Sequence, residues 1–166
     1  MSELQPTGRE GENASRDWPD EQRVALGLWV ALARCYSTFG KAIVTKITEH
    51  DLTVPQFGTL EALYHLGPLT LGELADKLLV TGGNVTYVMD RLEARGLVAR
   101  YRSEEDRRVV HAQLTADGRE LISNVFPIHA EHVQHLCRHL DGREQEDLRR
   151  LLKTLGRGIA GEDLQT

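Results

Sequence analysis

Residues 70–114 constrain the fold more than any other stretch of this chain. The stretch begins with a short helix pattern, LGELADKLL, for which Thr70 and Glu73 form a capping box. After the break VTGG, a second helix pattern covers about residues 82–95 and stops at Gly96, a residue type that favours helix ends. Two helices joined by a short turn that contains glycine form a helix-turn-helix, whose second helix enters the major groove of DNA.

The residues after this motif predict a β-hairpin. LVARYR is a candidate strand, residues 103–107 form a polar turn, and residues 108–114 alternate with a period of two, which is typical of a half-buried strand. A helix-turn-helix followed by such a hairpin is a winged helix. Asp106, Arg107 and Arg108 lie at the predicted wing tip, where an arginine can reach the minor groove. We expect Asp106 to brace Arg108 as the chief minor-groove residue, because residues two apart point to the same side.

Several segments in and around the motif match one known family. They are LTVPQFGTLEAL, LGELADKL, NVTYVMDRLEARGLV, EEDRR and LTADGREL. Together they resemble the MarR family of transcriptional regulators over about residues 20–159. The segments NVTYVMDRLE, HAQLTADG and FPIHAEH are most similar to the branch that represses hydroquinone, catechol and quinone resistance genes. The resemblance implies a mainly α fold with a small β-wing and an intertwined homodimer built from the N- and C-terminal helices.

Three regions are expected along the chain. Residues 1–19 are polar and predict a disordered tail. Residues 53–115 contain the winged helix-turn-helix DNA-binding domain, whereas residues 20–52 and 116–166 contain helices with wide apolar faces that suit a shared dimerisation core. A symmetric dimer sets two recognition helices about 34 Å apart, so the partner is expected to be double-stranded DNA with an inverted-repeat operator.

Capping residues mark the other predicted helix starts. Asp20, Thr53, Thr115 and Asp141 each precede a run of helical periodicity. Pro127 lies inside the helix that follows Thr115, so a kink is expected there.

The charge distribution favours nucleic acid only locally. The net charge is −5; residues 1–80 hold 7 basic and 11 acidic side chains, and residues 112–166 hold 7 and 9. Residues 81–111 hold 6 and 5, and all six basic residues are arginines, which suit phosphate and base contacts better than lysines. A solvated helix face would also explain so small a bias, so the order of the motifs, and not the charge, carries the DNA-binding prediction.

Helical spacing selects the residues that read DNA. Asn84, Tyr87 and Arg91 lie on one side of the predicted recognition helix, and Asp90 is expected to orient a neighbouring arginine without contacting DNA. Asparagine suits adenine, and arginine suits guanine or phosphate. The residues predicted to contact DNA are Thr81, Gly83, Asn84, Thr86, Tyr87, Arg91, Arg102, Asp106, Arg107 and Arg108.

Aromatic and polar residues of the first two predicted helices form a candidate effector pocket. The aromatic ones are most simply core residues, but the family resemblance implies ligands between the dimer helices and the winged domain. The candidate pocket for a small phenolic or quinone ligand consists of Trp29, Arg34, Tyr36, Phe39, Phe57, Tyr64 and His65. Cys35 is interpreted first as a small buried hydrophobe, and a thiol that reacts with an electrophilic quinone is the alternative.

Other chemistries receive little support from the sequence. His129, His132, His135 and His139 spread over three helical turns and are interpreted as packing or solvated residues, with a metal shared by His135 and His139 as the alternative. No nucleophile or phosphate-binding signature is present, so no catalytic residue, metal, cofactor or enzymatic activity is expected. Without a long apolar run or a signal core, no membrane association and a cytoplasmic location are expected.

The combined prediction is a sequence-specific, DNA-binding transcriptional regulator that acts as a dimeric repressor. A small phenolic or quinone effector, or modification of a thiol, is expected to release it from DNA. Two other classes remain open: an adaptor that uses the winged helix for protein contact, and a small thiol-dependent enzyme that scavenges electrophiles through Cys35. Specific, salt-dependent DNA binding separates the first class from both others, whereas turnover of a quinone supports the enzyme.

Overall fold

The structure is a computed structural model of the chain, and it describes residues 18–78 and 81–163. Of the predicted tail of residues 1–19, only Trp18 and Pro19 are among the described residues. Val80 of the predicted turn VTGG also lies outside the described residues. The described residues fall into two compact units that divide between Thr38 and Phe39.

The first unit consists mainly of helix α1 (Asp20–Thr48), which continues into the second unit. The prediction that Asp20 is the N-cap is wrong by one residue, because the Arg23 N–H donates to the Pro19 carbonyl at 3.0 Å and Asp20 is already helical. The Asp20 carboxylate instead pairs with the Arg23 guanidinium in the first turn, where a negative charge interacts favourably with the helix dipole.

The second unit contains the winged helix. Its further helices are α2 (Val54–Leu66), α3 (Leu71–Leu78), α4 (Gly82–Ala94), α5 (Ala116–Cys137) and α6 (Gly142–Asp163), and its strands are β1 (Leu69–Thr70), β2 (Val98–Arg102) and β3 (Val110–Leu114). The predicted fold class, mainly α with a small β-wing, is confirmed. The sequence did not predict β1, because two residues give no alternation to detect. β1 pairs with β3, so the antiparallel sheet has the order β1-β3-β2.

Side-chain caps fix the predicted helix boundaries. Capping boxes or single caps begin four helices at the predicted residues, namely Thr53, Thr70, Thr115 and Asp141. Helix α4 ends as predicted, because Gly96 adopts φ +69° directly after the C-cap. Helix α5 continues as one helix through Pro127, and the expected kink there remains a prediction.

One hydrophobic core holds the winged helix together. Helix α4 contributes four buried side chains, and helix α2 contributes three large ones. The core also includes Ile47 from the end of α1, Ala112 from β3, and Ile122 and Val125 from α5. Burial of one face of α4 fixes the rotation of this helix and therefore the side chains that its other face presents.

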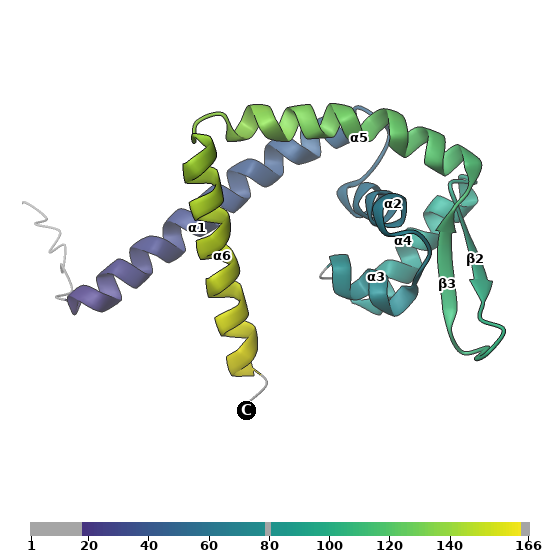
Figure 1. The fold of residues 1–166 in the computed structure, drawn as a ribbon, viewed down its shortest axis with the longest axis horizontal. Helices are drawn as coiled ribbons and strands as arrows, with labels where there is room; N and C mark the ends of the chain where they lie inside the picture. The colour runs from purple at the N-terminus through teal and green to yellow at the C-terminus, as the bar shows by residue number, and fades with distance from the viewer. Residues whose placement is uncertain (1–17, 79–80, 164–166) are drawn as a thin grey trace, which may run out of the picture. The chain divides into compact units, whose positions relative to one another are not determined.

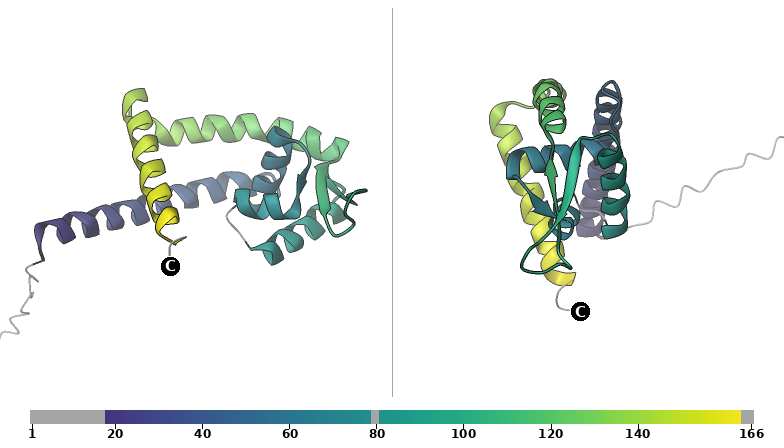
Figure 2. Two further views of the ribbon diagram at one scale, coloured as in Figure 1. Left: turned by 60° about the horizontal axis from the view of Figure 1, so that its bottom comes forward. Right: turned by 90° about the vertical axis from the view of Figure 1, so that its right-hand side faces the viewer.

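The β2–β3 hairpin lies beside α4, and its tip projects away from α5 in both Figure 1 and Figure 2. The register pairs Val98 with Leu114 and Arg102 with Val110. Among the described residues, no helix combines the length and apolarity that crossing a membrane requires.

Candidate nucleic-acid interface

The two faces of helix α4 differ in burial as its sequence predicts. Val85 and Leu92 are at most 1% exposed, and Val88 is 5% exposed. The opposite face presents Asn84 and Arg91 to solvent together with Tyr87, whose side chain is 60% exposed. The residues predicted to read bases therefore share an open surface that the core holds at a fixed rotation.

Helix α4 begins with two glycines, Gly82 and Gly83. Gly82 and Gly83 are exposed, and a Cβ added at either would meet no atom within 4 Å. The N-cap residue Thr81 makes no side-chain capping hydrogen bond, and the Thr86 hydroxyl donates to the Gly82 carbonyl at 3.1 Å. Exposed first-turn amides and the positive end of the helix dipole suit a phosphate.

An aromatic contact restrains the predicted guanine-reading side chain. The Arg91 guanidinium carbon lies 5.2 Å from the centroid of the Tyr87 ring, one helical turn earlier. A cation–π contact at an exposed site contributes about 0.5–1 kcal/mol. It reduces the conformational freedom that Arg91 would lose on binding a base.

The wing tip has the predicted brace between Asp106 and Arg108. The Arg108 guanidinium donates to the Asp106 carboxylate through Nε at 3.1 Å and through Nη2 at 3.0 Å, and the Arg108 backbone N–H donates to the same group at 2.9 Å. These hydrogen bonds hold the pKa of the Asp106 carboxyl below its ordinary value. The Arg108 side chain is nevertheless 91% exposed, so it is oriented and still available.

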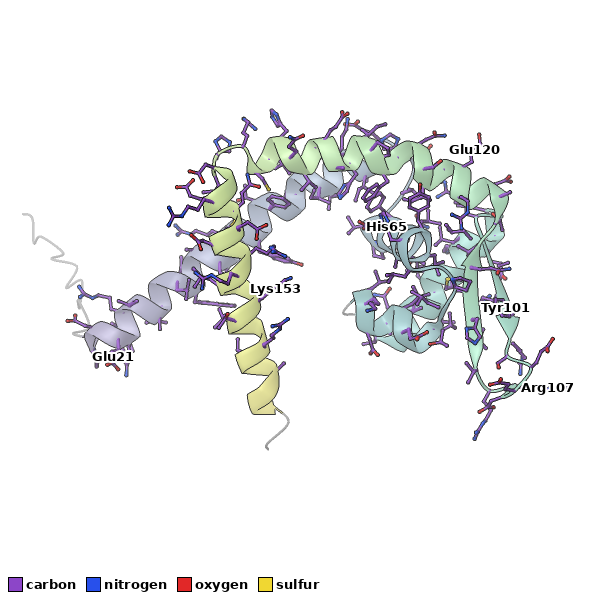
Figure 3. All side chains as sticks on the ribbon, viewed as in Figure 1. Glu21, His65, Tyr101, Arg107, Glu120 and Lys153 are labelled. Carbon is purple, nitrogen blue, oxygen red and sulfur yellow. The ribbon has the colours of Figure 1, made fainter. Side chains whose placement is uncertain are left out.

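Hydrogen bonds within the turn give the tip a defined shape. The Ser103 N–H donates to the Val109 carbonyl at 3.0 Å, and the Ser103 hydroxyl accepts from the Glu105 N–H at 3.2 Å. Arg102 donates to the Arg107 carbonyl at 3.2 Å. Figure 3 shows Arg107 at the end of the hairpin, where its side chain points away from the helices. The wing thus presents several arginines beyond the body of the winged helix.

Arg100 joins the wing to the recognition helix, and the sequence reasoning missed it. Its guanidinium pairs with Asp90 at 2.7 Å and donates to Glu93 through Nε at 3.0 Å. The hydrogen bond from Arg100 lowers the pKa of Glu93. The prediction that Asp90 orients a neighbouring arginine is confirmed. The available signal was that Arg100 is a charged residue at an inward position of the strand alternation, and that Asp90 and Glu93 are acidic residues three apart on the helix.

The candidate effector residues of the second unit are largely packed against one another and against α5. Phe57 is 3% exposed, and its ring centroid lies 4.5 Å from that of His129. Tyr64 is half-buried and meets the ring of His65 edge-on, while His65 meets Phe126 in the same way at 4.5 Å. These contacts support the interpretation of Phe57 as a core residue.

The other candidate effector residues are divided between the two units. Phe39 is half-buried at the start of the second unit, whereas Trp29, Arg34 and Tyr36 are exposed in the first. Cys35 is also exposed, so its interpretation as a buried hydrophobe is wrong for the single chain. The reason is that only the C-terminal end of α1 packs into the core, where Ile47 is buried, whereas Cys35 lies about three helical turns earlier.

The histidines of α5 and His139, which follows that helix, have separate environments. Burial lowers the pKa of His129, and the nearby charge of Glu61 acts in the opposite direction. The His132 Nε2 atom lies 3.3 Å from the Ala42 carbonyl oxygen, and His135 and His139 are exposed. In the part of the chain that the structure describes, no three potential ligands converge on a metal position.

Comparison with known proteins places this geometry among transcriptional regulators. The model of the MarR family matches residues 52–110. The HTH-type transcriptional regulator MhqR of Bacillus subtilis (strain 168) is 36% identical over 132 residues, which cover 80% of this chain and 91% of that protein.

Two solved structures have the same fold. A MarR mutant from E. coli complexed with operator DNA has a TM-score of 0.70 and 25% identity, with coverage of 81% of this chain and 96% of that one. Bordetella bronchiseptica BpsR, whose DNA binding is regulated by 6-hydroxynicotinic acid, has a TM-score of 0.72 and 28% identity, with coverage of 78% and 98%.

Proposed function

Because this chain belongs to the MarR family of DNA-binding transcriptional regulators, we propose that it is a homodimeric repressor of an inverted-repeat operator. Helix α4 enters the major groove, and the β2–β3 wing follows the backbone into the adjacent minor groove. The observation that carries this proposal is the exposed arginine Arg108, held by a carboxylate at the wing tip. A braced arginine loses less conformational entropy when it enters a narrow groove, whose potential attracts it.

Each exposed group of α4 and the wing has a role in this proposal. Asn84 reads an adenine and Arg91 reads a guanine, because their donor and acceptor patterns match those base edges. The exposed amides near Gly83 hold a backbone phosphate. Arg107 and Arg108 supply charge to the minor groove. Base contacts thereby set the sequence preference, and phosphate contacts set the register.

Exposed apolar stripes support the homodimer. Helix α6 carries five large apolar side chains that are 39–54% exposed and recur at helical spacing, Leu148, Leu151, Leu152, Leu155 and Ile159. In the first unit, α1 exposes Val24, Leu28 and Trp29 by more than half. Contiguous exposed apolar surface of this kind marks an interface, and a second copy of the chain is the partner that the family implies. The dimerisation region would then comprise residues 20–52 and 116–166.

We propose that a small phenolic or quinone effector, or modification of Cys35, releases the protein from DNA. The resemblance to the branch that represses hydroquinone, catechol and quinone resistance genes and the regulation of BpsR by 6-hydroxynicotinic acid, a hydroxylated aromatic acid, support this class of ligand. The exposed thiol of Cys35 supports the covalent route. An effector shifts the equilibrium only by its different affinity for the DNA-binding and released states.

The test begins with DNase footprinting over the DNA upstream of the protein's own gene, followed by titration with phenols and quinones. We expect protection that survives random competitor DNA and is lost with the effector. Non-specific binding alone would contradict the repressor and favour the adaptor. Comparison with Cys35→Ser separates the two release routes, since a variant that still responds fully to quinone excludes the thiol.

A further inference from the structure

The C-terminal end of α4 is a junction of three segments. The recognition helix, the corner between α1 and α2 (residues 49–53, the α1–α2 corner) and the start of α5 meet at residues 95–97. This junction lies at the C-terminal end of α4, one turn beyond Arg91 and about 20 Å from the helix N-terminus, near which Asn84 lies. A small rotation at the junction therefore displaces the side chains that read bases.

Arg95 ties the recognition helix to the α1–α2 corner. Its Nη1 atom donates to the Asp51 carbonyl at 2.7 Å, across 44 residues of sequence. Asp51 has φ +55°, a left-handed conformation that turns the chain out of α1. The next residue, Leu52, is 2% exposed and belongs to the core. The acceptor carbonyl is thus held by the end of one helix and by a buried anchor.

The start of α5 is fastened to the same place. The Thr115 hydroxyl donates to the Gly96 carbonyl at 2.6 Å, and the Thr115 N–H donates to the Leu97 carbonyl at 3.1 Å. A Cβ added at Gly118 would lie 1.8 Å from the Leu97 carbonyl oxygen. Only glycine permits this approach, so α5 and the end of α4 are in direct backbone contact.

We infer that Arg95 is a positioning residue for operator binding. It holds α4 at the angle set by the α1–α2 corner, and it acts through the helix without contacting DNA. This inference rests on the proposed function, because the corner and α5 belong to the helices assigned to the dimer core. Movement of those helices is transmitted to α4 through residues 95–97, and the hydrogen bond of Arg95 to the α1–α2 corner transmits the movement of α1.

The competing explanation is that Arg95 contacts a phosphate. Arg95→Ala distinguishes the two, because the loss of a phosphate contact weakens binding to every DNA sequence and flattens the salt dependence by about one contact. The loss of a positioning residue lowers operator affinity by roughly three- to tenfold, the effect of about one hydrogen bond. It leaves affinity for random DNA and the salt slope unchanged. Arg95→Lys, which keeps a donor, is expected to recover most of the operator affinity.

Arg138→Ala is the matched control. Arg138 also donates from Nη1 to a backbone carbonyl, that of His135 at 2.6 Å, but within one helical turn. Because this hydrogen bond does not join two elements, Arg138→Ala should leave the ratio of operator to random-DNA affinity unchanged. The inference would be overturned if Arg95→Ala lost equal affinity for operator and random DNA and had a flatter salt dependence, or if it lost affinity for neither DNA.

A measurement without DNA keeps this test separate from the proposed function. Amide hydrogen exchange in residues 49–53 and 95–97 should accelerate in Arg95→Ala relative to wild type and to Arg138→Ala. Unchanged exchange at the α1–α2 corner would refute the link whether or not an operator exists. Failure of the wild-type protein to bind specific DNA would instead refute the repressor.

Discussion

Gly118→Ala tests the close contact between α5 and the end of α4 most severely. The added Cβ would start 1.8 Å from the Leu97 carbonyl oxygen and 2.8 Å from its carbonyl carbon, whereas Cβ atoms essentially never approach other atoms within 3.0 Å. The atom in the way is backbone, so no side-chain rotation relieves the overlap. The start of α5 must move away from Leu97.

That movement removes the two hydrogen bonds that Thr115 makes to Gly96 and Leu97. Each contributes about 0.5–1.5 kcal/mol, and overpacking strain adds about 1–3 kcal/mol. The better helix propensity of alanine offsets about 1 kcal/mol. We expect Gly118→Ala to lower the free energy of unfolding by about 1–5 kcal/mol.

The assay is urea denaturation followed by circular dichroism at fixed protein concentration, since a dimer's stability depends on concentration. Gly72→Ala is the control, because Gly72 also lies in a first helical turn and its nearest new contact would be the Thr70 hydroxyl at 3.9 Å. That change should be neutral or stabilising by up to about 1 kcal/mol. If the two variants were equally stable, the close approach of α5 to Leu97 would be refuted.

Three further predictions concern the wing, the recognition helix and α5. Arg108→Ala should weaken DNA binding nearly equally for all operator sequences and flatten the slope of log affinity against log salt concentration by about one contact. Asp106→Ala should also weaken DNA binding, although this substitution removes a negative charge. Tighter DNA binding by Asp106→Ala in a filter or fluorescence assay would exclude the brace. Asn84→Ala should cost roughly 1–3 kcal/mol at one base position, measured with a set of single-base operator variants, and an unchanged base preference would reject its role. Because burial lowers the pKa of His129 in the folded protein, unfolding takes up a proton, so its contribution to stability is complete above the unfolded pKa of about 6.5 and decreases as the pH falls below it. The denaturation midpoint of the wild type should fall relative to that of His129→Phe as the pH is lowered from about 8 to about 5, and parallel pH profiles would show that His129 does not contribute.

Local rules predicted the winged helix well. The capping boxes at Thr53 and Thr70 and the positive φ at Gly96 depend on residues within one turn of each other. Helical periodicity likewise separated the buried Val88 from the exposed Tyr87. The Asp106–Arg108 brace was also predicted, but the reason given for it was wrong. Both residues lie in the turn before β3, which begins at Val110, and the turn brings them together, since the Asp106 carboxylate also accepts the Arg108 backbone N–H.

Features that depend on contacts between elements were not predictable. Arg100 pairs with Asp90 only because β2 lies against α4, and Arg95 reaches Asp51 across 44 residues. The exposure of Cys35 was also missed, since an apolar helical stripe does not reveal whether the same chain or another covers it. The predicted contacts with DNA, effector and second protomer remain predictions for this reason.

The most direct test of the proposed function is a footprint of the purified wild-type protein on the DNA upstream of its gene, read at single-base resolution and repeated at several salt concentrations. A dimer that reads DNA through α4 and the wing should protect two inverted half-sites about one helical turn apart on one face of the duplex. Its affinity there should exceed that for random DNA by about a thousandfold or more at physiological salt. Uniform protection without half-sites, or equal affinity for operator and random DNA, would contradict sequence-specific repression by this protein.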